Sequence, residues 1–326
     1  MVRAQFAIVG AGAIGSVLAA HLARAGHDVV VLARGKRAAH IERAGLQIRG
    51  LAELSQRVRV LTEPARLEAA DTLILATKTY ATATALASLR GARIGQAFSI
   101  QNGLQKNAQL AETWGRECVL GALADTSGEL LGSGEVLFTR NEQLLIGELS
   151  GAGSTRTSEL ARTMDSAGVR TSAVDNIQEL EWSKFAAWTG LMVLSITTRA
   201  PTWQYLVDAD SARVLARLVR EIGALAAAYG ISLSDRAPLP VATIVAGSED
   251  AAVDAIRAAG ERFKARAPAH RMSSLQDLEA GRPIEVEETL GYAVRLAQQT
   301  NVSLPLLAAF YGLVAAADRI RPPPPA

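Results

Sequence analysis

The sequence predicts two domains, an α/β domain built on a parallel sheet and then an all-helical domain. In the first half, short runs of β-branched or apolar residues alternate with alanine-rich helical segments, which is the pattern of βα units. From Gln178 onward the strand-like runs stop, and apolar residues recur at three- and four-residue spacing. A chain of 326 residues, 49% of them hydrophobic, is long enough to bury two cores. We therefore expect domains at residues 1–175 and 176–320, followed by a proline-rich, disordered tail at 321–326.

The first domain should contain parallel strands and a hairpin. Strands are expected where short apolar runs alternate with helical segments, at Phe6–Val9, Val29–Leu32, Leu73–Ala76, Ala97–Ile100 and Val119–Ala122. Glycines bracket two further runs, Glu135–Arg140 and Gln143–Glu148, which we interpret as a hairpin. A helix at Thr157–Ala167 and a short strand near Val169–Val174 would complete this domain.

The second domain should consist of long helices. Helical periodicity predicts them at Ile177–Thr197, Ala209–Tyr229, Ala251–Arg266, Glu285–Gln299 and Pro305–Ala317. Gly230 is placed to end the second of these helices, and Pro305 suits the first turn of the last one.

Composition limits the possible partners. Since 34 basic residues nearly balance 32 acidic ones, nothing indicates a nucleic acid or a membrane surface, and the ligand should be small. The single cysteine, Cys118, excludes an internal disulfide and fits a reducing compartment, while the four histidines lack metal-ligand spacing and imply no metal. Three glycines interrupt the apolar start, unlike a secretory signal, and no segment approaches the roughly 20 apolar residues of a membrane span. We expect a soluble, cytoplasmic protein.

A glycine-rich turn carries the clearest functional signal. Gly10, Gly12 and Gly15 form G-x-G-x-x-G directly after an apolar strand and before the helical run Ile14–Ala25. The first glycine permits a tight turn, the second lets a pyrophosphate approach the backbone, and the third lets the helix pack close to the strand. The N-terminus of the helix then offers N–H donors to phosphates. The pattern predicts a Rossmann-type dinucleotide-binding domain.

The end of the second strand indicates which dinucleotide binds. An NAD enzyme usually places Asp or Glu there, against the ribose hydroxyls. This chain has Ala33 and Arg34, followed by Lys36 and Arg37. A cationic position suits the 2′-phosphate of NADP(H), although a solvated basic loop would give the same sequence.

Polar residues that follow other strands, or interrupt apolar helices, are candidates for chemistry. Lys78 and Asn102 follow predicted strands and should lie at the ligand-binding edge of the sheet, although a surface lysine and a turn asparagine are the ordinary alternatives. Lys184 lies in an apolar helix and could protonate a developing alkoxide, or simply pair with Glu181. Ser273 and Glu285 belong to a polar stretch that N-capping and a charged first helical turn would also explain.

Taken together, these residues resemble the ketopantoate reductase (2-dehydropantoate 2-reductase) family over nearly the whole chain. The matching pieces are Ile8-Val9-Gly10-Ala11-Gly12-Ala13-Ile14-Gly15, Lys78, Gln101-Asn102-Gly103, Lys184, Thr198-Arg199-Ala200-Pro201, and Ser273-Ser274-Leu275-Gln276-Asp277 leading to Glu285. The resemblance implies NADPH as cofactor, a role in pantothenate biosynthesis, a possible homodimer, and an all-α second domain like that of 6-phosphogluconate dehydrogenase.

The resemblance also implies a role for each matching residue. Lys184 would be the general acid, and Glu285 would bind and orient the substrate. Lys78 and Asn102 would lie by the nicotinamide and the substrate, and Ser273 would contact the substrate carboxylate. The loop from Gly10 through Ala11, Gly12, Ala13 and Ile14 to Gly15 would bind the cofactor together with Arg34.

Three positions depart from the family pattern. Where family members typically carry asparagines one and two turns after the lysine, this chain has Trp188 and Met192, and a commonly amidic position is Leu290. Loss of amides removes hydrogen bonds that a hydroxylated substrate needs, so Trp188 and Met192 would favour a more apolar 2-oxo acid. Three hypotheses follow: NADPH-dependent reduction of 2-dehydropantoate, reduction of a branched or aromatic 2-oxo acid, and a non-catalytic NADPH-binding regulator.

Overall fold

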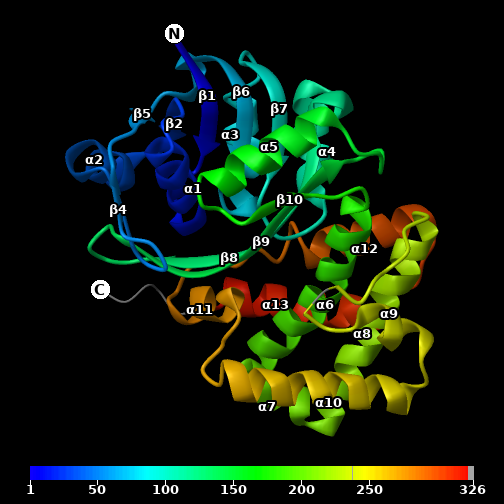
Figure 1. The fold of residues 1–326 in the computed structure, drawn as a ribbon. Coiled ribbons are helices and arrows are strands. Elements are labelled where there is room, and N and C mark those ends of the chain that lie inside the picture. Colours follow the sequence, from blue (N-terminus) through cyan, green and yellow to red (C-terminus); the bar gives the residue numbers. More distant parts are fainter. Residues whose placement is uncertain (237, 322–326) are drawn as a thin grey trace. The chain divides into compact units, whose positions relative to one another are not determined.

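The computed structural model describes residues 1–236 and 238–321, and the chain divides into two compact units (Figure 1). The first unit holds residues 1–102 and 106–177, and the second holds residues 103–105 and those from Gln178 onward. Apart from Arg321, the tail that the sequence predicts to be disordered lies outside the described residues.

A five-stranded parallel sheet forms the centre of the first unit. Its order is β5 (Arg59–Leu61), β2 (Val29–Leu32), β1 (Val2–Val9), β6 (Leu67–Leu75) and β7 (Arg93–Ser99). Four of these strands confirm predicted ones, whereas β5 was not predicted. Because all the strands are parallel, the residues that follow Val9, Leu32, Leu75 and Ser99 meet at one edge of the sheet.

The second sheet corrects two predictions. The fifth predicted strand, Val119–Ala122, leads into β8 (Leu120–Leu130), which pairs antiparallel with β9 (Val136–Glu148). Val119, just before β8, makes an isolated bridge to Ala97 of β7. The predicted hairpin within 135–148 is wrong, since β9 runs through it unbroken. The polar residues around Glu142 that resemble a turn instead form a β-bulge, where Asp125 pairs with Gln143 and Thr126 with Asn141.

The turn of the actual hairpin lies between β8 and β9. There the Leu131 amide donates to the Glu135 carbonyl, and Gly134 takes a φ of 90°. The rest of this sheet comprises β10 (Thr171–Ala173), β3 (Leu46–Gly50) and β4 (Leu54–Gln56).

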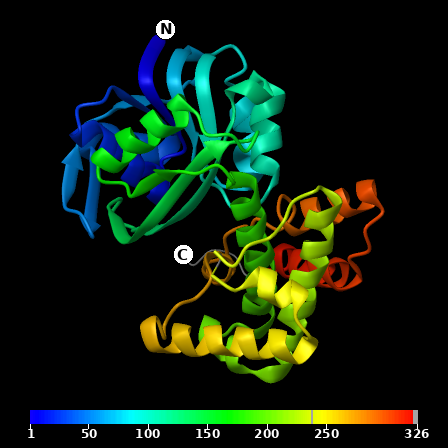
Figure 2. The same ribbon diagram turned by 45° about the vertical axis from the view of Figure 1, so that its right-hand side comes forward.

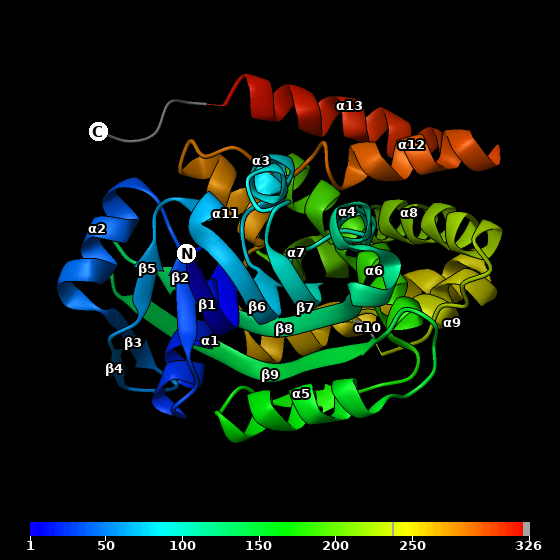
Figure 3. The ribbon, with the colours of Figure 1, turned by 90° about the horizontal axis from the view of Figure 1, so that it is seen from above.

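The helices of the first unit cover both faces of the parallel sheet (Figure 3). Helix α1 (Ala13–Arg24) packs between the two sheets, where it contacts β3, β4, β8 and β9. Helices α3 (Thr82–Ala87) and α4 (Gln105–Trp114) pack on the other face, α5 (Thr155–Ser166) packs on β9 and β10, and α2 (Gly35–Ala44) contacts β5. Short 3₁₀ turns are η1 (Pro64–Arg66), η2 (Thr79–Ala81) and η3 (Arg116–Cys118).

Cys118 is buried where η3 leads into β8. Its thiol donates a hydrogen bond to the Ile94 carbonyl, with 3.5 Å between sulfur and oxygen. Burial raises the pKa of the Cys118 thiol above its ordinary value.

The second unit is helical, as predicted (Figure 2). Its helices are α6 (Ile177–Thr198), α7 (Thr202–Val207), α8 (Ala209–Ala228), α9 (Val241–Ala246), α10 (Glu249–Arg266), α11 (Ser273–Glu279), α12 (Leu290–Thr300) and α13 (Pro305–Arg319). The short helices α7, α9 and α11 were not predicted. Gly230, with a φ of 69°, directly follows the Tyr229 cap of α8, and Pro305 opens α13, as expected.

The helix predicted to start at Glu285 starts five residues later, at Leu290. The Thr289 hydroxyl donates to the Glu285 carbonyl, which would accept an amide hydrogen bond in a continuous helix. Residues 285–289 therefore form a turn, and Glu285 lies outside the helix.

Candidate functional site

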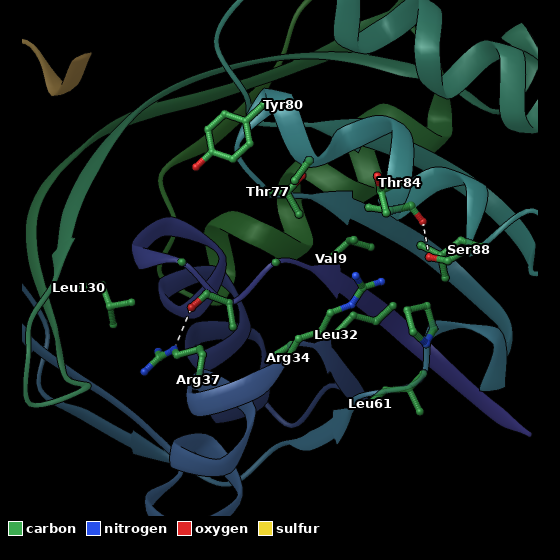
Figure 4. A pocket seen from close by; sticks show the side chains of 18 residues that line it. Val9, Leu32, Arg34, Arg37, Leu61, Thr77, Tyr80, Thr84, Ser88 and Leu130 are labelled. Atoms are coloured by element: carbon green, nitrogen blue, oxygen red, sulfur yellow. Dashed lines mark hydrogen bonds between the residues drawn. The ribbon is translucent and has the colours of Figure 1, made fainter. Parts of the chain in front are cut away.

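A pocket of about 560 Å³ lies at the carboxyl edge of the parallel sheet (Figure 4). Its size is in the usual range for small-molecule sites. The eighteen lining residues all belong to the first unit: Val9, Gly10, Ala11, Gly12, Leu32, Ala33, Arg34, Arg37, Leu61, Pro64, Thr77, Tyr80, Ala81, Thr84, Ala85, Ser88, Leu89 and Leu130. The sheet topology thus brings the glycine loop and Arg34 together, as their places after β1 and β2 predict.

The three glycines of the loop differ in the space around them. Gly10 has a φ of 105°, and a Cβ there would lie 2.8 Å from the Thr77 amide nitrogen. A Cβ on Gly15 would lie 2.1 Å from the Gly10 carbonyl oxygen, so helix α1 can approach the strand only without a side chain. A Cβ on Gly12 would meet nothing within 4 Å. Gly10 and Gly15 thus shape the loop, whereas Gly12 leaves room beside it.

Gly12 is also the N-cap of α1, and as a glycine it has no side chain that could cap the helix. The first amides of a helix have no partners within the helix, so Ala13, Ile14 and Gly15 present donors at this end. Open space beside such an N-terminus fits a phosphate group. The loop therefore fits the pyrophosphate of a dinucleotide.

The wall after β2 is cationic. Arg34 is exposed, and its side chain extends among the lining residues (Figure 4). Two arginines but no Asp or Glu are found among the eighteen described residues that line the pocket. Such a wall offers no carboxylate to a ribose diol but can accept a phosphate. Lys36, which the sequence places in the same cationic group, is exposed and does not line the pocket.

Arg37 does not point outward as a solvated cation would. Its Nε donates to the Ala11 carbonyl at 2.8 Å (Figure 4). Its Nη1 donates to the Gly134 carbonyl at 2.6 Å, and its Nη2 donates to the Ser16 hydroxyl at 2.8 Å. Burial lowers the pKa of Arg37 from its ordinary value. The sequence gives no signal for these bonds, because they join residues far apart along the chain.

The far end of the pocket is apolar. Leu32, Leu61, Pro64, Ala85 and Leu89 line it, and Tyr80 and Leu130 are large, exposed apolar side chains within the lining set. An apolar slot next to a phosphate-binding loop suits the flat adenine ring of a dinucleotide.

Gln101 connects the loops that carry Lys78 and Asn102. Its side-chain amide donates to the Thr77 carbonyl at 2.8 Å and to the Thr82 hydroxyl at 2.7 Å, and its oxygen accepts from Ser99. Lys78 is exposed at the start of η2, and Asn102 is partly buried directly after Gln101. Neither lines the pocket: Lys78 directly follows Thr77, which does, and Asn102 follows Gln101, which is hydrogen-bonded to Thr77.

Lys106 is a buried lysine that no pattern in the sequence indicates. Its ammonium donates to the carbonyls of Ser99 and Ala122, which joins the carboxyl end of β7 to β8. The segment before it carries Gly103, where a Cβ would lie 3.1 Å from the Thr289 side chain. Gly103 thus leaves little space for a side chain beside Thr289.

In the second unit, Lys184 differs from its neighbours on α6. Within the described stretch 180–196 every residue is buried except Lys184, which is partly exposed. Trp188 is 8% exposed and Met192 is fully buried, and both belong to the core of the helical unit. Trp188 also stacks on Phe185, with 6.3 Å between ring centroids. This burial favours a packing role for Met192 over direct contact with a ligand.

The remaining predicted substrate residues lie on connecting segments of the same unit. Ser273 is exposed as the first residue of α11; the N-cap is Met272, so capping does not explain this serine. Glu285 is partly exposed in the turn before α12. Leu290 is fully buried in the same core as Met192. In the described residues, no cluster of three or more His, Cys, Asp or Glu could hold a metal, and no helix could cross a membrane.

Comparison with known proteins gives matches along both units. The family described as "Ketopantoate reductase PanE/ApbA" matches residues 6–151, and its C-terminal counterpart matches residues 176–318. A 2-dehydropantoate 2-reductase of Archaeoglobus fulgidus is 28% identical over 295 residues, which cover 90% of this chain and 91% of the relative.

Two solved structures extend the comparison. The crystal structure of 2-dehydropantoate 2-reductase from Methylococcus capsulatus has a TM-score of 0.79 at 27% identity, over 97% of this chain and 96% of the other. A complex of D-mandelate dehydrogenase with NADH has a TM-score of 0.82 over 98% of this chain and 100% of the other. Its identity of 18% limits that likeness to the fold.

Proposed function

The chain belongs to the ketopantoate reductase family, a family of pyridine-nucleotide oxidoreductases, and from this premise we propose that it reduces 2-dehydropantoate to pantoate with NADPH. This reaction would place it in pantothenate biosynthesis, in the cytoplasm. The observation that carries the choice of cofactor is the wall of the dinucleotide pocket. Arg34 extends into it, and none of its described lining residues is acidic. A 2′-phosphate there would gain a charge-assisted partner, whereas the bare ribose of NADH would gain none.

The bound cofactor would supply the hydride that reaches the carbonyl carbon of the substrate. The protein's own residues would bind and orient the substrate and deliver a proton. Lys184 is proposed as the general acid that donates a proton to the carbonyl oxygen, and its partial exposure on an otherwise buried stretch of α6 supports this role. Lys78 and Asn102 would stabilise the developing charge on that oxygen. Glu285 would accept a hydrogen bond from a substrate hydroxyl, and Ser273 would donate one to the carboxylate.

The decisive test is the rate of NADPH oxidation by the purified full-length chain. We expect the highest kcat/KM with 2-dehydropantoate, compared with branched and aromatic 2-oxo acids of similar size, and a lower KM for NADPH than for NADH. Equal rates with NADH would remove the proposed role of Arg34. Binding of NADPH without oxidation by any 2-oxo acid would instead support the non-catalytic regulator.

A second candidate is the reduction of a bulkier, more apolar 2-oxo acid. Trp188, Met192 and Leu290 favour it, because apolar side chains there offer no hydrogen bonds to a hydroxylated substrate. The full burial of Met192 and Leu290 within the helical core argues for the first candidate, since it accounts for both residues by packing. The same substrate panel separates the two: a preference for phenylglyoxylate or a branched 2-oxo acid would support the second.

A homodimer is proposed from the family resemblance. Sedimentation equilibrium of the full-length chain tests it, and a mass of one chain across the micromolar range would reject it.

A further inference from the structure

The two arginines that line the dinucleotide pocket are bonded in different ways. Arg34 is exposed and extends among the lining residues, whereas each guanidinium nitrogen of Arg37 donates to an acceptor within the protein. The three acceptors belong to three separate elements: the glycine loop, the first turn of α1 and the turn between β8 and β9. Arg37 therefore connects the loop to two neighbouring elements.

The bond to the Ala11 carbonyl has a direct effect on the loop. The Ser16 hydroxyl donates to the same oxygen at 3.1 Å while it accepts from Arg37, so the carbonyl is held by two donors. A trans peptide is planar, with its C=O and N–H directed to opposite sides. Fixing the Ala11 carbonyl on the Arg37 side thus turns the Gly12 amide away from Arg37. Gly12 lines the pocket and has open space around it.

We propose that Arg37 is a positioning residue that holds the glycine loop in its phosphate-binding shape, and that recognition of the 2′-phosphate falls to Arg34 alone. The inference rests on the proposed use of a dinucleotide. It assigns different roles to Arg34 and Arg37, which are close together in the sequence. Three of the five N–H groups of Arg37 already donate within the protein, one from each nitrogen, and these bonds fix the orientation of its guanidinium.

The turn at Gly134 strengthens this assignment. The Gly134 carbonyl accepts from Arg37, and a Cβ on Gly134 would lie 2.3 Å from the His40 ring, one turn further along α2. Helix α2 thus contacts this turn through both side chains, close to Leu130, which lines the pocket. The bonds of Arg37 are part of a packed contact, in which the guanidinium has little freedom to turn toward a ligand.

The test compares the affinities of NADPH and NADH for full-length variants, measured by nicotinamide fluorescence. Arg34→Ala should weaken NADPH about 30-fold and NADH less than about threefold, because only one of the two carries a 2′-phosphate. Arg37→Ala should weaken both cofactors by a similar factor, about tenfold, so that their ratio stays within about twofold of wild type. Arg37→Lys should resemble Arg37→Ala, since a lysine keeps the charge but lacks the planar fork of donors.

Ser16→Ala is the milder companion variant. It removes one acceptor of Arg37 and the second donor to Ala11, and it should weaken both cofactors equally, about threefold. If Arg37→Ala does not fold, the affinities of Ser16→Ala and Arg37→Lys for NADPH and NADH test the positioning role instead.

Two results would overturn the inference: selective loss of NADPH in Arg37→Ala or Arg37→Lys, or unchanged affinity for both cofactors in all three variants. Wild-type protein that binds neither cofactor would instead refute the proposed function. Wild type that prefers NADPH while Arg37→Ala loses NADPH selectively would refute the positioning role alone.

Discussion

The glycine loop of the first unit and helix α6 of the second carry their candidate residues in opposite ways. The candidate site in the loop is formed by backbone: Gly12 leaves open space, Gly10 and Gly15 permit close approach, and Arg37 donates to the Ala11 carbonyl. On α6 the candidate group is one partly exposed side chain, Lys184, within a stretch that is otherwise buried. A site formed by backbone therefore depends on positions that carry no side chain. The candidate on α6 depends instead on one residue that is partly exposed while its neighbours are buried.

The largest expected effect concerns the helical side of this comparison. Lys184→Ala should lower kcat by about 10²- to 10⁴-fold, the range typical for loss of a general acid, while the Kd for NADPH changes little. Single-turnover kinetics together with NADPH titration would measure both quantities. Lys264→Ala, which removes an exposed lysine that lies over the Trp203 ring, serves as the control and should keep wild-type kcat. If Lys184→Ala turns over at the wild-type rate, the helical unit contributes no acid through this residue.

A pair of glycine substitutions sharpens the account of the loop. Gly15→Ala places a methyl group 2.1 Å from the Gly10 carbonyl oxygen and should lower the free energy of unfolding by about 3 kcal/mol. Gly12→Ala meets no protein atom within 4 Å and should leave stability nearly unchanged while it weakens NADPH binding about tenfold. Urea unfolding and NADPH titration give the two readouts. Unchanged NADPH affinity in Gly12→Ala would show that the open space at Gly12 does not receive the cofactor.

The next prediction tests whether Met192 on α6 belongs to the protein core or contacts the substrate. Met192→Asn puts an amide at a fully buried position, so we expect a loss of about 2 kcal/mol in the free energy of unfolding and no gain in kcat/KM for 2-dehydropantoate. Met192→Leu, which keeps the residue apolar, should cost less than about 1.5 kcal/mol. A rise in activity with 2-dehydropantoate in the asparagine variant would instead place Met192 against the substrate.

The smallest expected effect lies outside the pocket lining, at the ion pair between Glu148 of β9 and Arg156 of α5. The hydrogen bond from Arg156, at 2.6 Å, lowers the pKa of the Glu148 carboxyl in the folded state. A lowered folded pKa stabilises the protein above the unfolded value, about 4.3, and this contribution is lost as the pH falls through the folded value. Arg156→Ala should thus cost about 1 kcal/mol near neutral pH and progressively less under acid conditions.

Unfolding in urea across this pH range measures the difference between Arg156→Ala and wild type. Arg140→Ala breaks a more exposed pair with Asp125 and should have less effect at every pH. NADPH affinity should stay at the wild-type value in both variants. A pH-independent cost of Arg156→Ala would show that its bond to the Glu117 carbonyl, and not the ion pair, provides the stability.

Local patterns predicted much of the fold and part of the candidate site. The strands that lead into the glycine loop and Arg34, and the helices α6, α8, α10 and α13, follow from apolar periodicity, because burial dictates it directly. The prediction of a hairpin within 135–148 was wrong because a β-bulge and a turn contain similar polar residues. Only the pairing with β8 identifies the polar residues around Glu142 as a bulge. The hydrogen bonds of Arg37, Gln101 and Lys106 join segments that are distant in sequence, so no local sequence pattern predicts them. Likewise, the periodicity of α6 predicts that Met192 faces an apolar environment, but it does not show whether that environment is the protein core or a substrate pocket.

Burial of the one cysteine has a practical consequence for following this protein in solution. Because Cys118 is buried and its thiol stays protonated near neutral pH, thiol-reactive dyes should modify the native chain only slowly. A cysteine introduced at an exposed position such as Tyr80 would then be the single fast-reacting thiol. A fluorophore attached there would report ligand entry at the mouth of the pocket without any need to remove a native cysteine.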